Sequence, residues 1–377
     1  MSKKVFAAET HELDDHAISW FGLCPWSRTA CFGTEDGHFG IVAKRHQYKA
    51  RHKVRFHRGA GEPVNGVAFL EDIVMFTSRS AMIAVRRDGT GRDRLNTRHV
   101  EIDYGSHGVV GLPAARSFLS AHGHDGLVLA MPREGGVDTK QIIAPEFDFQ
   151  QVLSLGSPWG PDVIAAACGT RGVVGFRFDR GQKDIPIHVR TGEGSDVAVI
   201  AKVGHPDLPY AVVAVDADGT ISFLDDVLGG GGVHQITPPY PIGVVYEAIV
   251  SSGHLFILTS THLHCVPDLV KKVLARAESF NGFGFECDAS DLLPVGKRSF
   301  ALIGGSTADV IEFEADRLVR QAAESKATVR GRKRPSGRPV SLIKRVTDID
   351  LTTDTPVWES FHNKIVSSDS TSLVAAV

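Results

Sequence analysis

The chain has 377 residues, of which 42% are hydrophobic and 23% are charged, and its formal net charge is −3. This composition excludes an intrinsically disordered chain, and the small net charge excludes a uniform field that would draw the whole molecule onto nucleic acid or an anionic membrane. Glycine, with 39 residues, and proline, with 18, supply the many tight turns that a protein of short strands needs.

The N-terminal segment MSKKVFAAETHELDD has acidic residues where a secretory signal would have its apolar run. No segment of the chain approaches the roughly 18 apolar residues of a membrane-spanning helix. We therefore expect a cytoplasmic protein without a membrane partner. The cysteines are odd in number and never form a CxxC pair, so we expect buried reduced thiols at Cys24, Cys31, Cys168, Cys265 and Cys287.

A strand-turn-strand pattern recurs seven times along the chain. Each copy has an apolar strand, a short turn of small or polar residues and a second strand with alternating apolar positions. The copies span residues 28–42, 72–86, 116–130, 163–178, 210–224, 254–266 and 299–313. A period of about 45 residues with four strands per unit is typical of a propeller blade. The period follows from aligning the turns at Gly37, Ala81, Gly126, Gly172, Gly219, Thr261 and Asp309.

The segments that flank these copies complete the blades. Apolar runs precede several copies, and we expect them to form the innermost strands at 16–24, 63–70, 107–113 and 195–203. More polar extended stretches follow the copies, which suits an outermost strand with an exposed edge. These stretches lie at 52–58, 98–105, 141–147, 185–191 and 233–240.

Asp-Gly pairs at Asp36-Gly37, Asp125-Gly126 and Asp218-Gly219 indicate tight hairpins, because glycine accepts the positive φ that such turns require. The motif GTEDGHFGIV at 33–42 resembles the strand-turn-strand signature of WD40-like propellers, although no repeat ends in Trp-Asp. This resemblance covers residues 5–316. It implies an all-β fold, a seven-bladed β-propeller with four antiparallel strands per blade and a C-terminal extension.

The propeller is expected to occupy residues 1–318, with the segment 4–12 closing the last blade as its outer strand. The segment from Pro267, PDLVKKVLARAES, predicts a short amphipathic helix in the link between blades six and seven. Residues 319–345 have the composition of a flexible basic linker, and residues 346–377 that of a docking tail. Its expected anchors, which would contact either the edge of the ring or another protein, are Val357, Trp358 and Phe361.

No catalytic signature is present, and we expect no enzyme activity, cofactor or metal. His122 with His124, and His262 with His264, could each offer two ligands from one face of a strand, but two ligands are too few for a metal site. The more ordinary role of such histidines is hydrogen bonding.

Positive charge is concentrated in two segments. Residues 44–98 hold 13 Lys or Arg and five acids, residues 326–345 hold eight Lys or Arg and no acid, and the remainder of the chain has a net charge of −19. These basic segments could meet phosphate or an acidic protein surface, or they could simply protect a strand edge from pairing. The candidate contacts are Lys44, Arg45, Lys49, Arg51, Arg86, Arg87, Arg330, Arg332, Lys333 and Arg334.

The function expected from these features is that of a non-enzymatic scaffold or subunit in a multiprotein assembly, with one or more proteins as partners. Binding of nucleic acid or another polyanion through the basic segments is an alternative. A propeller enzyme with a site on the central axis is a third. No small-molecule substrate is inferred.

Overall fold

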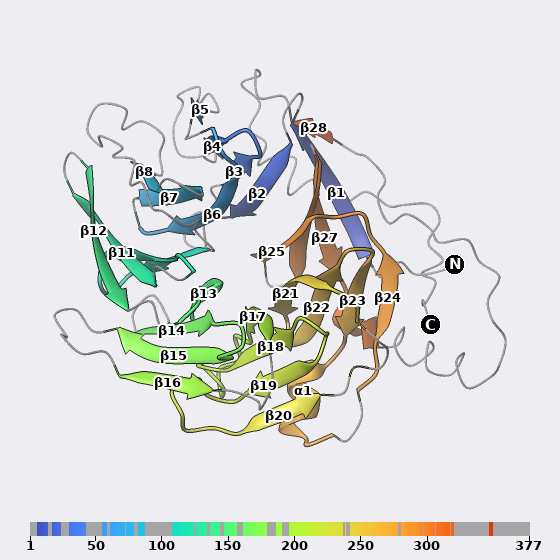
Figure 1. Cartoon of the computed structure of the whole chain (residues 1–377). Coiled ribbons are helices and arrows are strands. Elements are labelled where there is room, and N and C mark those ends of the chain that lie inside the picture. The colour runs from blue at the N-terminus through green and yellow to red at the C-terminus, as the bar shows by residue number, and fades with distance from the viewer. Residues whose placement is uncertain are drawn as a thin grey trace.

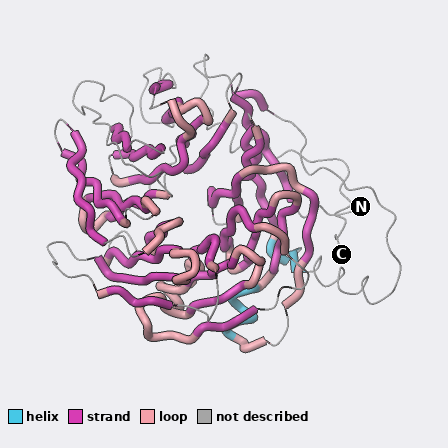
Figure 2. The backbone as a smooth tube through the Cα atoms, viewed as in Figure 1, coloured by secondary structure: helices cyan, strands magenta, loops and turns pink. Residues whose placement is uncertain are grey.

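The computed structural model shows seven β-sheets arranged radially around a central axis (Figure 1). Strands account for nearly all of the regular structure (Figure 2). The structure describes residues 6–13, 17–23, 30–42, 55–58, 61–71, 73–78, 82–86, 108–123, 126–133, 136–143, 147–156, 161–178, 186–190, 196–236, 238, 242–277, 280–296, 298–305, 307–316, 318–319 and 347–349.

The first four blades follow one another in chain order. Blade one contains β2 (Ile18–Leu23), β3 (Ala30–Thr34), β4 (His38–Val42) and β5 (Arg55–Arg58). Three described strands make up blade two, namely β6 (Val64–Phe69), β7 (Ile73–Ser78) and β8 (Met82–Arg86). Blade three contains β9 (Val109–Leu112), β10 (Ser117–Ala121), β11 (Leu127–Arg133) and β12 (Gly136–Ile143). Blade four contains β13 (Gln151–Ser154), β14 (Asp162–Ala167), β15 (Val173–Phe178) and β16 (Ile187–Arg190).

The remaining blades complete the ring. Blade five contains β17 (Val197–Lys202), β18 (Val212–Asp216), β19 (Ile221–Leu224) and β20 (Val233–Ile236). Blade six contains β21 (Val245–Ser251), β22 (His254–Thr259), β23 (His262–Val266) and β24 (Phe283–Glu286). Blade seven contains β25 (Asp291–Gly296), β26 (Ser299–Gly304), β27 (Thr307–Phe313), β1 (Phe6–Leu13) and β28 (Thr347–Ile349).

The fold expected from the repeats is confirmed. Each of the seven strand-turn-strand copies supplies the second and third strands of one blade, and neighbouring strands pair in antiparallel register. The alignment was wrong at one position, because Asp309 lies inside β27 and pairs with Leu302. The hairpin of blade seven turns instead directly after Gly304, which pairs with Thr307, and Gly305 there has a φ of 58°. The expected outer strand of blade two, at 98–105, lies outside the described residues.

The ring closes through the N-terminal strand. β1 pairs antiparallel with β27 from Phe6 opposite Phe313 to Glu12 opposite Thr307, which is the place proposed for the segment 4–12. β28 adds a fifth, parallel strand outside β1, so part of the C-terminal segment contacts the edge of the ring (Figure 1). The division of the chain at residues 318 and 345 stays a prediction.

The short helix α1 (Leu269–Leu274) lies where the sequence predicts a helix, but its place in the fold differs. It precedes β24, and β24 pairs with β23, so the helix connects two strands within blade six rather than blades six and seven. The sequence did not reveal β24, because its four residues, FGFE, are too short a run to separate from the connection around it. Leu269, Val270 and Val273 of the helix are buried.

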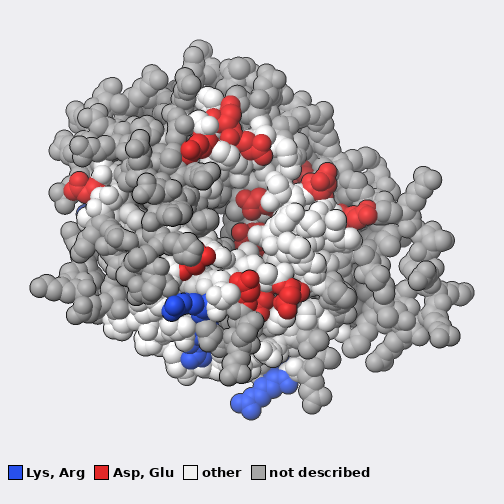
Figure 3. Space-filling model, in the orientation of Figure 1, with Lys and Arg blue, Asp and Glu red and all other residues white. Residues whose placement is uncertain are grey.

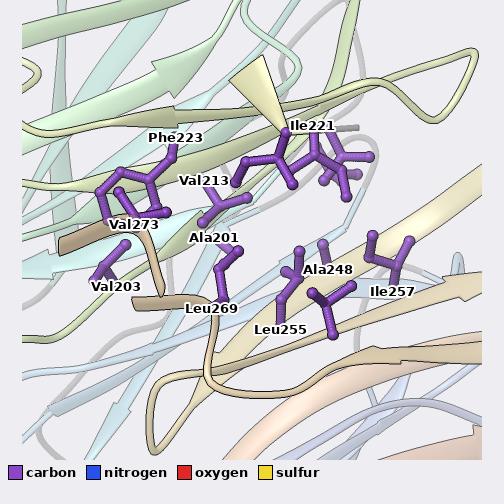
Figure 4. Close-up of a cluster of buried hydrophobic side chains, with 14 of the residues drawn as sticks. Ala201, Val203, Val213, Ile221, Phe223, Ala248, Leu255, Ile257, Leu269 and Val273 are labelled. Atoms are coloured by element: carbon purple, nitrogen blue, oxygen red, sulfur yellow. The ribbon is translucent and has the colours of Figure 1, made fainter. Parts of the chain in front are cut away.

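The core lies between adjacent blades. Figure 4 shows one such layer, in which side chains from β18 and β19 of blade five face those from β22 of blade six and those of α1. Aromatic rings fill two other layers. Phe39 stacks on Phe76 with ring centroids 4.3 Å apart, and the ring centroids of Phe256 and Phe300 are 4.7 Å apart. Because each layer is shared by two sheets, a blade is held in place by both of its neighbours.

We define the hairpin face as the face of the ring that holds the turns between the second and third strands of each blade and the connections into the innermost strands. At four junctions between blades on this face, the turn of one blade is hydrogen-bonded to the chain entering the next. The amide nitrogens of Ile18, Gly123, Val197 and Cys287 donate across these junctions to the carbonyl oxygens of Gly305, Phe149, Gly169 and Thr261, at 2.8–3.1 Å. These bonds hold neighbouring blades together on the hairpin face.

None of the helices among the described residues is long and apolar enough to span a membrane.

Candidate functional site

A cavity of about 680 Å³ lies on the axis of the ring. Its wall is built by the innermost strands of the blades, whose free edges lie side by side around the axis. All seven blades contribute to it, with Trp20, Asn65, Val109, Gln151, Lys202, Glu247 and Asp291 among the lining residues. The cavity therefore lies where the alternative of an axial site would place a ligand.

Strand direction decides at which end of the channel each polar side chain of this cavity lies. Every innermost strand starts at the hairpin face, so residues early in these strands lie at that end of the channel. Gln151 and Asp291 are the first residues of β13 and β25, and Asn65 and Glu247 are the second and third residues of β6 and β21. We call these four side chains the channel mouth. Lys202, the last residue of β17, lies at the opposite end.

Glu247 and Asp291 form a carboxyl pair in the channel mouth. Burial, and then the charge of Asp291, raises the pKa of Glu247 to about 8. Burial also raises the pKa of Asp291 to about 6, although its Oδ1 accepts a hydrogen bond from the Leu292 amide at 2.7 Å. Perturbed acids in a cleft are a common property of binding and catalytic sites.

Gln151 connects this pair to the neighbouring blades. Its Nε2 donates to Glu247 Oε1 at 3.3 Å, and its Oε1 accepts from the Ile200 amide at 2.7 Å. Glu247 Oε1 also accepts from the Ala248 amide at 2.9 Å. One oxygen of the carboxyl group is therefore fixed by the wall of the channel, which orients the group.

Around the channel mouth, the hairpin face is acidic. Figure 3 shows acidic side chains gathered around the central hollow. In the described turns and connections of this face, Arg171 is the only Lys or Arg, and its guanidinium lies 5.4 Å from the ring centroid of Phe147. The same segments hold seven exposed or half-buried acids, namely Glu35, Asp36, Glu62, Asp148, Asp196, Asp218 and Asp288. The connections of the opposite face include Arg116, Lys271, Lys272, Arg276 and Arg298, together with acids.

Three aspartates of blade five lie close together on the hairpin face, and we call Asp196, Asp216 and Asp218 the blade-five cluster. Asp216, at the end of β18, is only 6% exposed, and its Oδ1 has no hydrogen-bond partner among the described residues. Its pKa is raised to about 6, first by burial and then by the charges of Asp218 and Asp196. In contrast, hydrogen bonds from Thr220 lower the pKa of Asp218.

His122, His262 and His264 do not form a metal site with other described residues. His262 and His264 share one face of β23 as expected, with ring centroids 5.7 Å apart. Burial, and then His262, lowers the pKa of His264 to about 4. His122 is fully buried, whereas His124 lies outside the described residues. In the part of the chain that the structure describes, no group of three or more His, Cys, Asp or Glu side chains is arranged to hold a metal ion.

Four of the five cysteines are described, and all four are buried free thiols: Cys31, Cys168, Cys265 and Cys287. Burial raises the pKa of Cys168 and that of Cys287 to about 12, and raises that of Cys265 well above its usual value. These thiols are packing groups rather than nucleophiles.

The basic residues and anchors chosen from the sequence fall largely outside the described residues. Arg86 ends β8, but its side chain is not described. The others outside the described residues are Lys44, Arg45, Lys49, Arg51, Arg87, Arg330, Arg332, Lys333, Arg334, Val357, Trp358 and Phe361. Sequence reasoning missed the channel mouth. A signal for it existed, because Glu247 is the only charged residue of the innermost strand β21.

The solved structures that are similar to this chain include the following two. The WD40 domain of Neurospora crassa Pan2 matches with a TM-score of 0.56 at 10% identity, over 83% of this chain and 97% of that one. U3-55K matches with a TM-score of 0.55 at 8% identity, over 81% of this chain and 98% of that one. No family model and no curated protein matches the sequence. The chain therefore has the seven-bladed fold of WD40 domains.

Proposed function

We propose that this protein is a non-enzymatic binding platform of the cytoplasm, which holds one or more partner proteins on its hairpin face as part of a larger assembly. The observation that supports this most is the convergence of four polar side chains from four blades at the mouth of a channel, on a face fixed by hydrogen bonds between blades. Concave sites with a few convergent polar groups are the usual binding sites of proteins. Propellers of this fold commonly act as interaction scaffolds.

The proposal is tested by blocking the hairpin face without changing its charge. Ala217 and Gly243 are exposed on this face, and a Cβ at Gly243 would meet no atom of a described residue within 4 Å. We expect the double variant Ala217→Trp/Gly243→Trp to lose proteins that the full chain retains in quantitative affinity capture. The matched control, Pro206→Trp/Pro209→Trp, places the same bulk on an exposed connection of the opposite face. Equal capture by both variants would remove the hairpin face from the proposal.

An enzyme with its site on the axis is the second candidate, because two carboxyl groups with separated pKa values are also what acid–base catalysis uses. This candidate predicts a small molecule that co-purifies with the full chain and is lost in the Glu247→Gln variant. Native mass spectrometry of both proteins measures it. The platform proposal predicts the same mass, that of the protein alone, apart from the substitution.

Binding of nucleic acid or another polyanion through the basic segments stays a prediction. Affinity for such a ligand would fall steeply as salt is raised, since each phosphate contact releases counterions. The role of the C-terminal anchors is tested in the full chain by the variant Val357→Ala/Trp358→Ala/Phe361→Ala. If it retains the same partner as the wild type, the tail is not the contact we suppose.

A further inference from the structure

Negative charge on the hairpin face is spread over the ring rather than gathered at one point. The seven acids of its turns and connections come from the entry or hairpin of blades one, two, four, five and seven. A single ion could neutralise only a small part of such a surface. A ligand with several cations along its length could neutralise most of it.

The blade-five cluster provides the most defined binding site for one of these cations. The Oδ1 of Asp216 is buried without a hydrogen-bond partner in the part of the chain that the structure describes, and two further carboxylates lie close enough to disfavour its charged form. An unpaired acceptor in such a position costs free energy, and a cationic donor from a ligand would satisfy it. A guanidinium group fits this role better than a metal ion, because no described set of acids here is arranged for metal coordination.

The channel mouth offers a second binding site for a cation. Glu247 and Asp291 face a cavity large enough for a long side chain, and the wall beside them includes the apolar residues Val67 and Ile249. The methylene stem of a lysine or arginine suits such a wall, while its charged end suits the carboxyl pair.

Building on the proposed platform function, we propose that the partner presents an extended segment rich in arginine and lysine, which lies across the hairpin face and places one cation on Asp196, Asp216 and Asp218. Acids across the ring attract the segment, and the two binding sites, at the blade-five cluster and at the channel mouth, fix its position. The contact is between opposite charges, so salt weakens it.

The probe for this proposal is a fluorescein-labelled peptide in which five arginines alternate with Gly-Ser pairs, titrated against the full chain. The test variant is Asp196→Asn/Asp216→Asn/Asp218→Asn, which keeps the shape of each side chain and removes three charges. The matched control is Glu71→Gln/Asp207→Asn/Asp268→Asn, which removes three charges from the opposite face. We expect the cluster variant to weaken binding on the order of tenfold, because pairs of this kind each contribute modestly. The control should bind the peptide about as tightly as the wild type.

Several results would overturn the proposal. Equal weakening by the two triple variants would show that only net charge matters. Spermine binding as tightly as the peptide would point to a free polyamine rather than a protein segment. A peptide that binds only after the eight basic residues of 326–345 are replaced by glutamine would show that the chain's own segment takes this place.

The test is separable from that of the platform function. If the tryptophan variant on the hairpin face loses its partner while the cluster variant keeps it, the platform stands and the basic segment fails. If the triple variant does not fold, Asp196→Asn/Asp218→Asn affects only exposed side chains and should still weaken peptide binding severalfold.

Discussion

The substitution Glu247→Gln should make the protein more stable at alkaline pH. In the native state, burial and Asp291 raise the pKa of Glu247 from its ordinary 4.5 to about 8. Between these two values the unfolded chain gives up the proton while the native state holds it, so native stability falls as pH rises from 4.5 to 8. Glutamine stays neutral at every pH, and its Oε1 can accept the same hydrogen bonds from Ala248 and Gln151.

The size of the effect follows from that pKa difference. Without screening, it corresponds to at most about 5 kcal/mol above pH 8. Glu247 is half-buried beside an open channel, where water screens its charge, so we expect the variant to gain about 1–3 kcal/mol at pH 8. At pH 4.5 and below, the two proteins should have nearly the same stability.

Urea unfolding of the full chain at pH 4.5, 6 and 8 measures this difference. Glu286→Gln, at an exposed position in β24 of the same blade, is the control and should show little change. A Glu247→Gln variant that is less stable than the wild type at pH 8, or whose stability gain does not depend on pH, would refute the reasoning about the channel mouth.

Three further predictions concern the fold. Gly37→Ala should lower the free energy of unfolding by about 1–3 kcal/mol more than Gly61→Ala, as measured by thermal unfolding. Both glycines have a φ near 80°, but only at Gly37 would an added Cβ lie 2.7 Å from a backbone atom, the carbonyl oxygen of Glu62. Phe76→Ala should lower the free energy of unfolding by about 3–5 kcal/mol, because it leaves a cavity beside Phe39 in the core between blades one and two. Val189→Ala, at an exposed position, should change the free energy of unfolding little. Iodoacetamide at pH 8 should leave Cys168, Cys265 and Cys287 unmodified in the native protein and label them after unfolding, as mass spectrometry would show; rapid labelling of the native protein would contradict their burial.

The blade pattern could be predicted from the sequence because it depends on short-range features. Strand, turn and strand lie within about 15 residues, and glycine marks most of the turns. The alignment failed at Asp309 because blade seven has its glycine four positions earlier, at Gly305. The helix was assigned to the wrong connection because the following strand, β24, is short and gives no clear alternation.

The candidate site could not be predicted in the same way, because it depends on long-range neighbours. Gln151 and Glu247 are separated by 96 positions in the chain and become hydrogen-bonded only when the ring closes. Charge counting did show that the chain outside the basic segments is strongly acidic, but it did not show that the acids share a face. Strand direction decides that, since it places the hairpin turns and the entries to the innermost strands on one side.

Carboxyl footprinting of the full chain, alone and in complex with the partner it retains, tests the central claim most directly. Carbodiimide coupling to glycine ethyl ester labels accessible acids, and mass spectrometry locates them. We predict that the partner protects Glu35, Asp36 and Asp218 on the hairpin face and leaves Glu71 and Asp207 on the opposite face as reactive as before. Protection of Glu71 and Asp207, with the hairpin-face acids still reactive, would contradict the account.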